Sequence, residues 1–114
     1  MSEQQTQQQI RLALSRGPVR LWRNNTGMLL DRQGRPVTFG LCKGSSDLIG
    51  LRSVTIGPEH VGQTLAVFVA VEVKSAKGRT TAEQGAFIEQ VTAMGGLAGV
   101  ARTVGEAAAI LDLT

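Results

Sequence analysis

The sequence of 114 residues predicts a mixed α/β fold. Apolar residues recur at helical spacing in three segments, short extended segments bounded by turn residues lie between them, and one run, Leu65–Val71, is apolar throughout. The length fits a single domain covering residues 1–114. A domain of this size buries only about two-thirds of the surface of its unfolded chain, so we expect a homodimer to add stability.

The first half of the chain is expected to form a helix followed by short strands. Residues 2–16 favour a helix that Ser2 caps and that ends at Gly17-Pro18. Val19–Arg23 alternates apolar and basic residues, as a half-buried strand does. Further extended segments are expected at 28–30, 37–41 and 47–51, separated by a turn at 24–27 and loops at 31–36 and 43–46.

The second half predicts a strand, a helix, a strand and a final helix. A hairpin-like connection at 56–63 precedes Leu65–Val71, which we expect to be a strand covered on both faces at the centre of a sheet. Thr80–Gln84 holds two overlapping capping-box patterns, so a helix should run from there to about Met94 and stop at Gly95-Gly96. A strand at 97–102 and a helix capped by Thr103 complete the order.

Charge and cysteine usage narrow the possible functions. The formal net charge of +3 is compatible with binding a phosphate backbone. Cys42 and His60 are each the only residue of their type, which argues against a disulfide and against a zinc site within one chain. A metal would therefore be held by oxygen, which favours Mg²⁺ or Mn²⁺. No segment has the length of a membrane span or the pattern of a signal peptide, so we expect a cytoplasmic protein.

The most informative pattern is Glu72-Val73-Lys74, which ends the apolar run. Because strand side chains alternate, Glu72 and Lys74 point to one face and Val73 to the other. Two charges on one face of a core strand are costly unless each has a partner or a metal. The alternative interpretation is a structural ion pair at the end of the strand.

Asp47 supplies a second carboxylate at the start of another expected strand. If that strand pairs with the apolar strand through a hairpin at 53–64, Asp47 and Glu72 can meet. Two such carboxylates repel each other unless a divalent cation lies between them. A metal there would neutralise a phosphate and activate a bound water, and Lys74 would stabilise charge that develops in the transition state. Alternatively, Asp47 is a turn residue that accepts backbone hydrogen bonds.

These residues resemble the PD-(D/E)xK nuclease superfamily, and the wider pattern resembles its VRR-NUC (virus-type replication-repair nuclease) group. The matching segments are Arg23–Gly27, Lys43–Gly50, Val71–Lys74 and Thr81–Gln84, the last followed by a helix and Gly95-Gly96. The resemblance covers nearly the whole chain in the same order. One departure is that a serine, not a proline, precedes Asp47.

The resemblance implies a restriction-endonuclease-like core with a central mixed β-sheet flanked by α-helices, and Mg²⁺- or Mn²⁺-dependent cleavage of DNA. It implies that Asp47, Glu72 and the backbone carbonyl of Val73 are metal ligands and that Lys74 and Gln84 act in catalysis. Short members of the group resemble dimeric phage or bacterial enzymes that cut branched DNA such as four-way (Holliday) junctions. The expected location is then the cytoplasm of a bacterial or phage-infected cell.

Some of these residues also have structural interpretations. Glu3 matches the first-helix acid of the family and is a further candidate metal ligand, but a carboxylate there also favours the helix dipole. Gln84 fits both the catalytic role and a capping box. The candidate DNA contacts are Arg23, Asn25, Lys43, Ser46 and Lys77. Arg23 and Asn25 can equally hold a turn, and the 43–46 loop can simply be solvated.

The leading hypothesis is therefore a metal-dependent DNA endonuclease. A second hypothesis is a non-catalytic nucleic-acid-binding module that keeps the nuclease fold, although the presence of both carboxylates and the lysine argues against it. A third is a structural subunit of a replication or repair complex. Salt-dependent DNA binding without metal-dependent cleavage would favour the second, and failure to bind DNA at low salt would favour the third.

Overall fold

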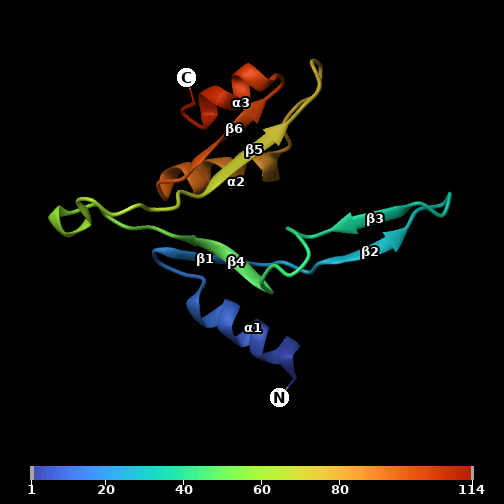
Figure 1. Cartoon of the computed structure of the whole chain (residues 1–114), viewed down its shortest axis with the longest axis horizontal. Helices are drawn as coiled ribbons and strands as arrows, with labels where there is room; N and C mark the ends of the chain where they lie inside the picture. The colour runs from blue at the N-terminus through green and yellow to red at the C-terminus, as the bar shows by residue number, and fades with distance from the viewer. Residues whose placement is uncertain (1, 114) are drawn as a thin grey trace. The chain divides into compact units, whose positions relative to one another are not determined.

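The computed structural model describes residues 2–113 and divides into two compact units. The first ends at Arg52 and the second begins at Ser53 (Figure 1). Each unit is an α/β arrangement with its own helices and strands. The fold is therefore mixed α/β, as predicted. Its described strands form three two-stranded sheets, in which the strand after Asp47 pairs with Val19–Arg23 and the strand that contains Glu72 pairs with Leu97–Ala101. The pairing expected between the two carboxylate-bearing strands is thus not observed, and one central sheet flanked by helices stays a prediction.

The first unit contains one helix and four short strands. They are α1 (Glu3–Leu14), β1 (Val19–Arg23), β2 (Gly27–Leu30), β3 (Pro36–Phe39) and β4 (Leu48–Arg52). Ser2 caps α1 through a capping box with Gln5, as its position in the sequence predicts. The helix is tied to the next strand by Ser15, whose Oγ accepts a hydrogen bond of 2.8 Å from the backbone N–H of Leu21.

The four strands of this unit form two antiparallel pairs. β1 pairs with β4, with Val19 opposite Arg52 and Arg23 opposite Leu48. β2 pairs with β3 in a hairpin that lies between β1 and β4 in the sequence. Most apolar side chains of the hairpin are exposed, including Leu29 at 67 % and Leu30 at 64 %. The strand predicted at 37–41 is observed at Pro36–Phe39. Its apolar residues Val37 and Phe39 are also exposed, at 49 % and 43 %.

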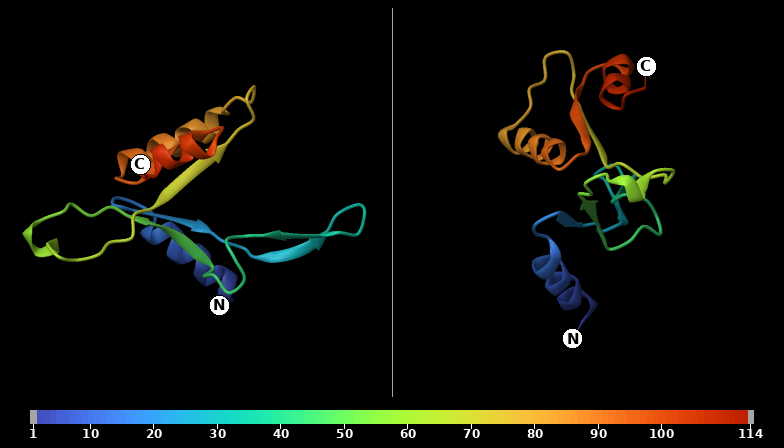
Figure 2. Two further views of the ribbon diagram at one scale, coloured as in Figure 1. Left: turned by 45° about the horizontal axis from the view of Figure 1, so that its top comes forward. Right: turned by 90° about the vertical axis from the view of Figure 1, so that its left-hand side faces the viewer.

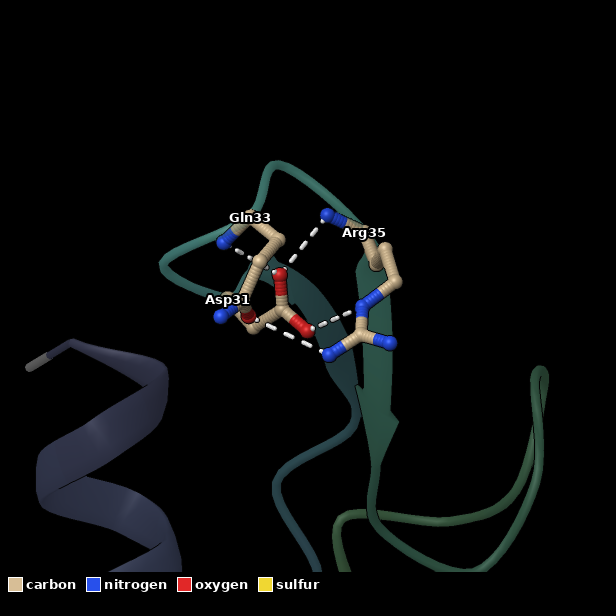
Figure 3. Close-up of polar contacts among 3 residues, drawn as sticks. All are labelled: Asp31, Gln33 and Arg35. Atoms are coloured by element: carbon tan, nitrogen blue, oxygen red, sulfur yellow. Dashed lines mark hydrogen bonds and ion pairs between the residues drawn. The ribbon is translucent and has the colours of Figure 1, made fainter.

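The tip of this hairpin is organised by the carboxylate of Asp31 (Figure 3). Its Oδ1 accepts hydrogen bonds from the backbone N–H groups of Gln33 and Arg35, at 2.9 and 2.8 Å. Its Oδ2 accepts a bond of 2.9 Å from Nε of Arg35. The backbone hydrogen bond from Arg35 is the main reason that the pKa of Asp31 lies below its ordinary value, and the side-chain bond from Arg35 adds to the effect.

The second unit contains a short 3₁₀-helix, two strands and two α-helices. They are η1 (Pro58–His60), β5 (Val69–Val73), α2 (Ala82–Ala93), β6 (Leu97–Ala101) and α3 (Val104–Ile110). β5 and β6 pair in parallel, with α2 as the crossover between them. Thr81 and Thr103 cap the two α-helices, and Gly95 follows α2 with a φ of +97°, as the sequence predicts.

The two α-helices of this unit cover opposite faces of the β5–β6 pair (Figure 2). A Cβ placed on Gly99 would lie 2.9 Å from Cδ1 of Ile110, so this face of β6 meets α3. A Cβ placed on Gly96 would lie 2.7 Å from Cγ1 of Val91, so the other face meets α2. Val91 is fully buried at this contact.

The prediction for the apolar run 65–71 was wrong in two respects. The strand begins only at Val69, and Leu65 and Val67 are 44 % and 53 % exposed. Continuous apolar composition indicates burial on both faces only where other elements cover both faces. Among the described strands β5 pairs with β6 in a two-stranded sheet, so it is not the central strand that was predicted. The connection predicted at 56–63 contains η1. No helix among residues 2–113 has the length and apolar character needed to cross a membrane.

The bonds at Asp31 make a prediction about pH. Because the folded hairpin favours the ionised carboxylate, its contribution to stability is complete at neutral pH and is lost as the pH falls through the lowered pKa. We expect the Asp31 carboxyl carbon, followed by NMR, to titrate at a lower pH in the protein than in an unstructured peptide of residues 29–37. Equal titration midpoints of Asp31 in the protein and in the peptide would show that the folded hairpin does not favour the ionised carboxylate.

Candidate active site

Glu72 and Lys74 lie at the carboxyl end of β5. Glu72 is paired with Val100 of β6, and the backbone N–H of Lys74 donates to the carbonyl of Ala101 at 3.1 Å, which continues the pairing past the strand. Side chains of paired residues in parallel strands share a face, so Glu72 lies with Val100 on the face opposite Gly99. That is the face covered by α2, and strand alternation assigns Lys74 to it as well.

Both charged side chains are partly sheltered from solvent. Glu72 and Lys74 are half-buried, whereas Val73 between them is 72 % exposed. This reverses the usual pattern, in which the apolar residue is buried and the charged residues are exposed. The sequence prediction that the two charges share one face is therefore consistent with the register and exposure of β5.

Gln84 lies in the first turn of α2, the helix that covers this face. The side-chain Oε1 of Gln84 accepts a hydrogen bond of 3.0 Å from the backbone N–H of Thr81. The backbone N–H of Gln84 in turn donates to Oγ1 of Thr81 at 3.1 Å. The capping interpretation is therefore confirmed. Because Oε1 is engaged at the cap, the amide Nε2 is the part of Gln84 best suited to contact a substrate, and a catalytic role stays a prediction.

Asp47 lies in the other unit, directly before β4. Its side chain is exposed, and its carbonyl accepts a hydrogen bond of 2.8 Å from the backbone N–H of Asn24. This bond extends the antiparallel β1–β4 ladder by one residue pair beyond Arg23 and Leu48. The backbone at Asp47 is thus fixed by a strand end, even though its carboxylate faces solvent.

Asn24 is the residue of this region that sequence reasoning missed. The sequence places it in a turn and in the family-like segment Arg23–Gly27 but assigns it no role, whereas in the structure it is 7 % exposed and its side chain makes three hydrogen bonds to the loop before Asp47. A buried amide left without partners costs about 1–3 kcal/mol per group, so these bonds matter for the loop. The available signal was an asparagine placed directly after a half-buried strand.

The remaining candidates are mostly exposed. Glu3 is the first residue of α1, where its carboxylate also favours the helix dipole. Arg23 borders a surface hollow that is otherwise lined by Ser2 and glutamines of α1. The other predicted DNA contacts, Asn25, Lys43, Ser46 and Lys77, are also exposed. Exposure suits a contact to DNA, and these assignments stay predictions.

The proposed metal ligands are oxygen atoms from three residues. Among residues 2–113, no three acidic, histidine or cysteine side chains gather as a metal site. The predicted set is different, because it combines the carboxylates of Asp47 and Glu72 with the carbonyl of Val73. These oxygen donors fit a hard cation such as Mg²⁺ or Mn²⁺ in their chemistry. The donors come from both units, and their convergence on one ion stays a prediction.

Comparison with known families identifies the class of the protein. A sequence model of the VRR-NUC domain matches residues 1–105 and so spans both units. The chain belongs to the VRR-NUC domain family. Neither the comparison with curated proteins nor that with solved structures gives a match. Family membership indicates a nuclease domain that acts on DNA, and nucleases of the PD-(D/E)xK type generally use divalent metals.

The cap of α2 gives a prediction about stability. Replacing Thr81 by alanine removes the acceptor for the N–H of Gln84 and should lower the free energy of unfolding by about 1 kcal/mol in urea denaturation. Thr80→Ala is the matched control, since Thr80 is exposed and lies outside the observed cap. Equal losses in the two variants would show that the cap contributes nothing specific.

Proposed function

We propose that this VRR-NUC protein is a Mg²⁺- or Mn²⁺-dependent DNA endonuclease. Asp47, Glu72 and the carbonyl of Val73 are the proposed metal ligands, with Glu3 as a further candidate. The family match supports this assignment because it spans both carboxylate-bearing segments. It also supports the interpretation of residues 1–114 as one domain, since it runs through the boundary between the two units.

The observation that carries the proposal is the shared position of Glu72 and Lys74. Both are half-buried at the end of β5, on the face covered by the helix that bears Gln84. A carboxylate and an ammonium sheltered together are costly unless they serve a partner or a ligand. An isolated surface ion pair would need neither the shelter nor the second carboxylate supplied by Asp47.

The chemistry assigned to the chain's own groups follows from their charge. A bound divalent ion supplies Lewis-acid activation of water and neutralises phosphate charge. Lys74 orients the attacking water or stabilises negative charge on the phosphate in the transition state, where an ammonium at a partly buried position is more effective than one in bulk water. Gln84 positions the water or a phosphate oxygen through its amide. Arg23, Asn25, Lys43, Ser46 and Lys77 contact the DNA backbone or bases.

The proposed substrate is branched DNA such as a four-way junction, cut by a homodimer. Two copies related by a two-fold axis would present two active sites at a fixed spacing, which suits a substrate with two related strands to cut. The limited burial expected of a small domain also favours a partner subunit.

Two substitutions test the catalytic assignment. We expect Glu72→Gln and Lys74→Met each to lower the rate of DNA cleavage with Mg²⁺ or Mn²⁺ by about a hundredfold or more, because each removes a charge needed in the transition state. Glu89→Gln, at an exposed position of α2, should cleave as fast as the wild type. Catalytic variants that cleave at the wild-type rate, or a wild type inactive on every DNA, would refute the proposal. Salt-dependent binding without any cleavage would favour a non-catalytic module.

Substrate preference and oligomeric state form a separate test. We expect a synthetic four-way junction to be cut at least about tenfold faster than linear duplex, a difference of about 1.4 kcal/mol in activation free energy. Light scattering should give the mass of two chains under the same conditions. Equal rates on junction, flap and duplex, or a monomer in the active preparation, would contradict the branched-DNA proposal without affecting the assignment of Glu72 and Lys74.

A further inference from the structure

The loop from Leu41 to Asp47 is held by one buried side chain, that of Asn24. Its Oδ1 accepts a hydrogen bond of 2.8 Å from the N–H of Leu41, at the beginning of the loop. Its Nδ2 donates to Oγ of Ser45 at 2.7 Å and to the carbonyl of Ser46 at 2.9 Å, near the end. Both amide protons and the carbonyl oxygen of Asn24 are thus in use, so the side chain has a single orientation.

Ser45 extends this network within the loop. Its Oγ donates to the carbonyl of Cys42 at 2.6 Å and accepts a bond of 3.3 Å from the N–H of the same residue. The backbone of Asn24 adds the bond to the carbonyl of Asp47. One residue therefore ties the start, the middle and the end of the loop to the last residues of β1.

We propose that Asn24 is a positioning residue that fixes Asp47 for binding a divalent ion. The inference rests on the proposed function, which makes Asp47 a metal ligand. The Asp47 side chain is exposed, so its direction depends mainly on the backbone that carries it. That backbone is anchored to Asn24 on one side and to β4 on the other.

A fixed ligand binds an ion more tightly than one on a mobile loop because less conformational freedom is lost on binding. Residues that orient metal ligands through hydrogen bonds contribute in this way, and their loss typically weakens metal binding by about 10- to 100-fold. Asn24 differs from such a residue only in acting through the main chain next to the ligand, not through the carboxylate itself.

The same unit offers a matched control in Asp31. Like Asn24, Asp31 organises a turn through several side-chain hydrogen bonds, but its turn is the tip of the β2–β3 hairpin. Asp31 has no role in the proposed site. A variant of Asp31 therefore reports what the loss of a turn-organising residue does to the protein in general.

The experiment measures Mn²⁺ binding to the 114-residue chain by electron paramagnetic resonance of the free ion, and backbone hydrogen exchange of residues 41–47 without metal. We expect Asn24→Ala to weaken Mn²⁺ binding by about 10- to 100-fold and to speed exchange in the loop. Ser45→Ala, which removes one partner of Asn24, should weaken binding by a smaller factor. Asp31→Ala should bind Mn²⁺ as the wild type does.

Three outcomes would overturn the inference. Wild-type Mn²⁺ affinity in folded Asn24→Ala is the first, and equal weakening by Asp31→Ala is the second. If Asn24→Ala does not fold, unchanged affinity in Ser45→Ala is the third. A wild type that binds Mn²⁺ but cuts no DNA would refute the nuclease proposal while the same binding constants still decide the role of Asn24. A wild type that binds no Mn²⁺ would refute both.

Discussion

The arrangement around Asp47 depends on a simple requirement, that a buried amide must find hydrogen-bond partners. Asn24 meets it by bonding to Leu41, Ser45 and Ser46, all in the loop before Asp47. Apart from Leu41, which is 64 % exposed, the loop consists of small or polar residues, so packing alone would not define its path. The hydrogen bonds of buried Asn24 therefore define the path of this loop, as packing against a hydrophobic core does for other segments. The loop ends at Asp47, a candidate metal ligand.

A different constraint shapes the other half of the proposed site. β5 and β6 run in parallel, so their connection must cross over one face of the pair, and α2 is that crossover. The crossover helix shelters the face that carries Glu72, and Gln84 lies in the first turn of that helix. The charges of Glu72 and Lys74 are therefore partly buried. In the proposed metal site, partial burial would strengthen electrostatic interactions while leaving access for the substrate.

Local signals predicted most of the secondary structure, whereas burial depended on contacts that they do not encode. Caps at Ser2, Thr81 and Thr103 and the glycines after α2 marked helix ends, because each meets a need of the backbone within a few residues. The apolar run before Val69 was misjudged, since composition shows what a segment could bury and not what covers it. At the site, alternation predicted that Glu72 and Lys74 share a face, but the role of Asn24 depends on partners 17 to 22 residues away.

The nested order of the first four strands has a consequence for how the chain folds. The β2–β3 hairpin lies inside the sequence that separates β1 from β4. Once the inner hairpin has closed, its ends are already near each other, and the entropy cost of joining the outer pair falls because the effective loop is shorter. The backbone bond between Asn24 and Asp47 continues the β1–β4 ladder, so it forms as the outer pair closes. The final conformation of the candidate ligand Asp47 therefore depends on closure of the outer pair, and a defect at the distant hairpin tip is expected to slow that step even though the tip does not contact Asp47.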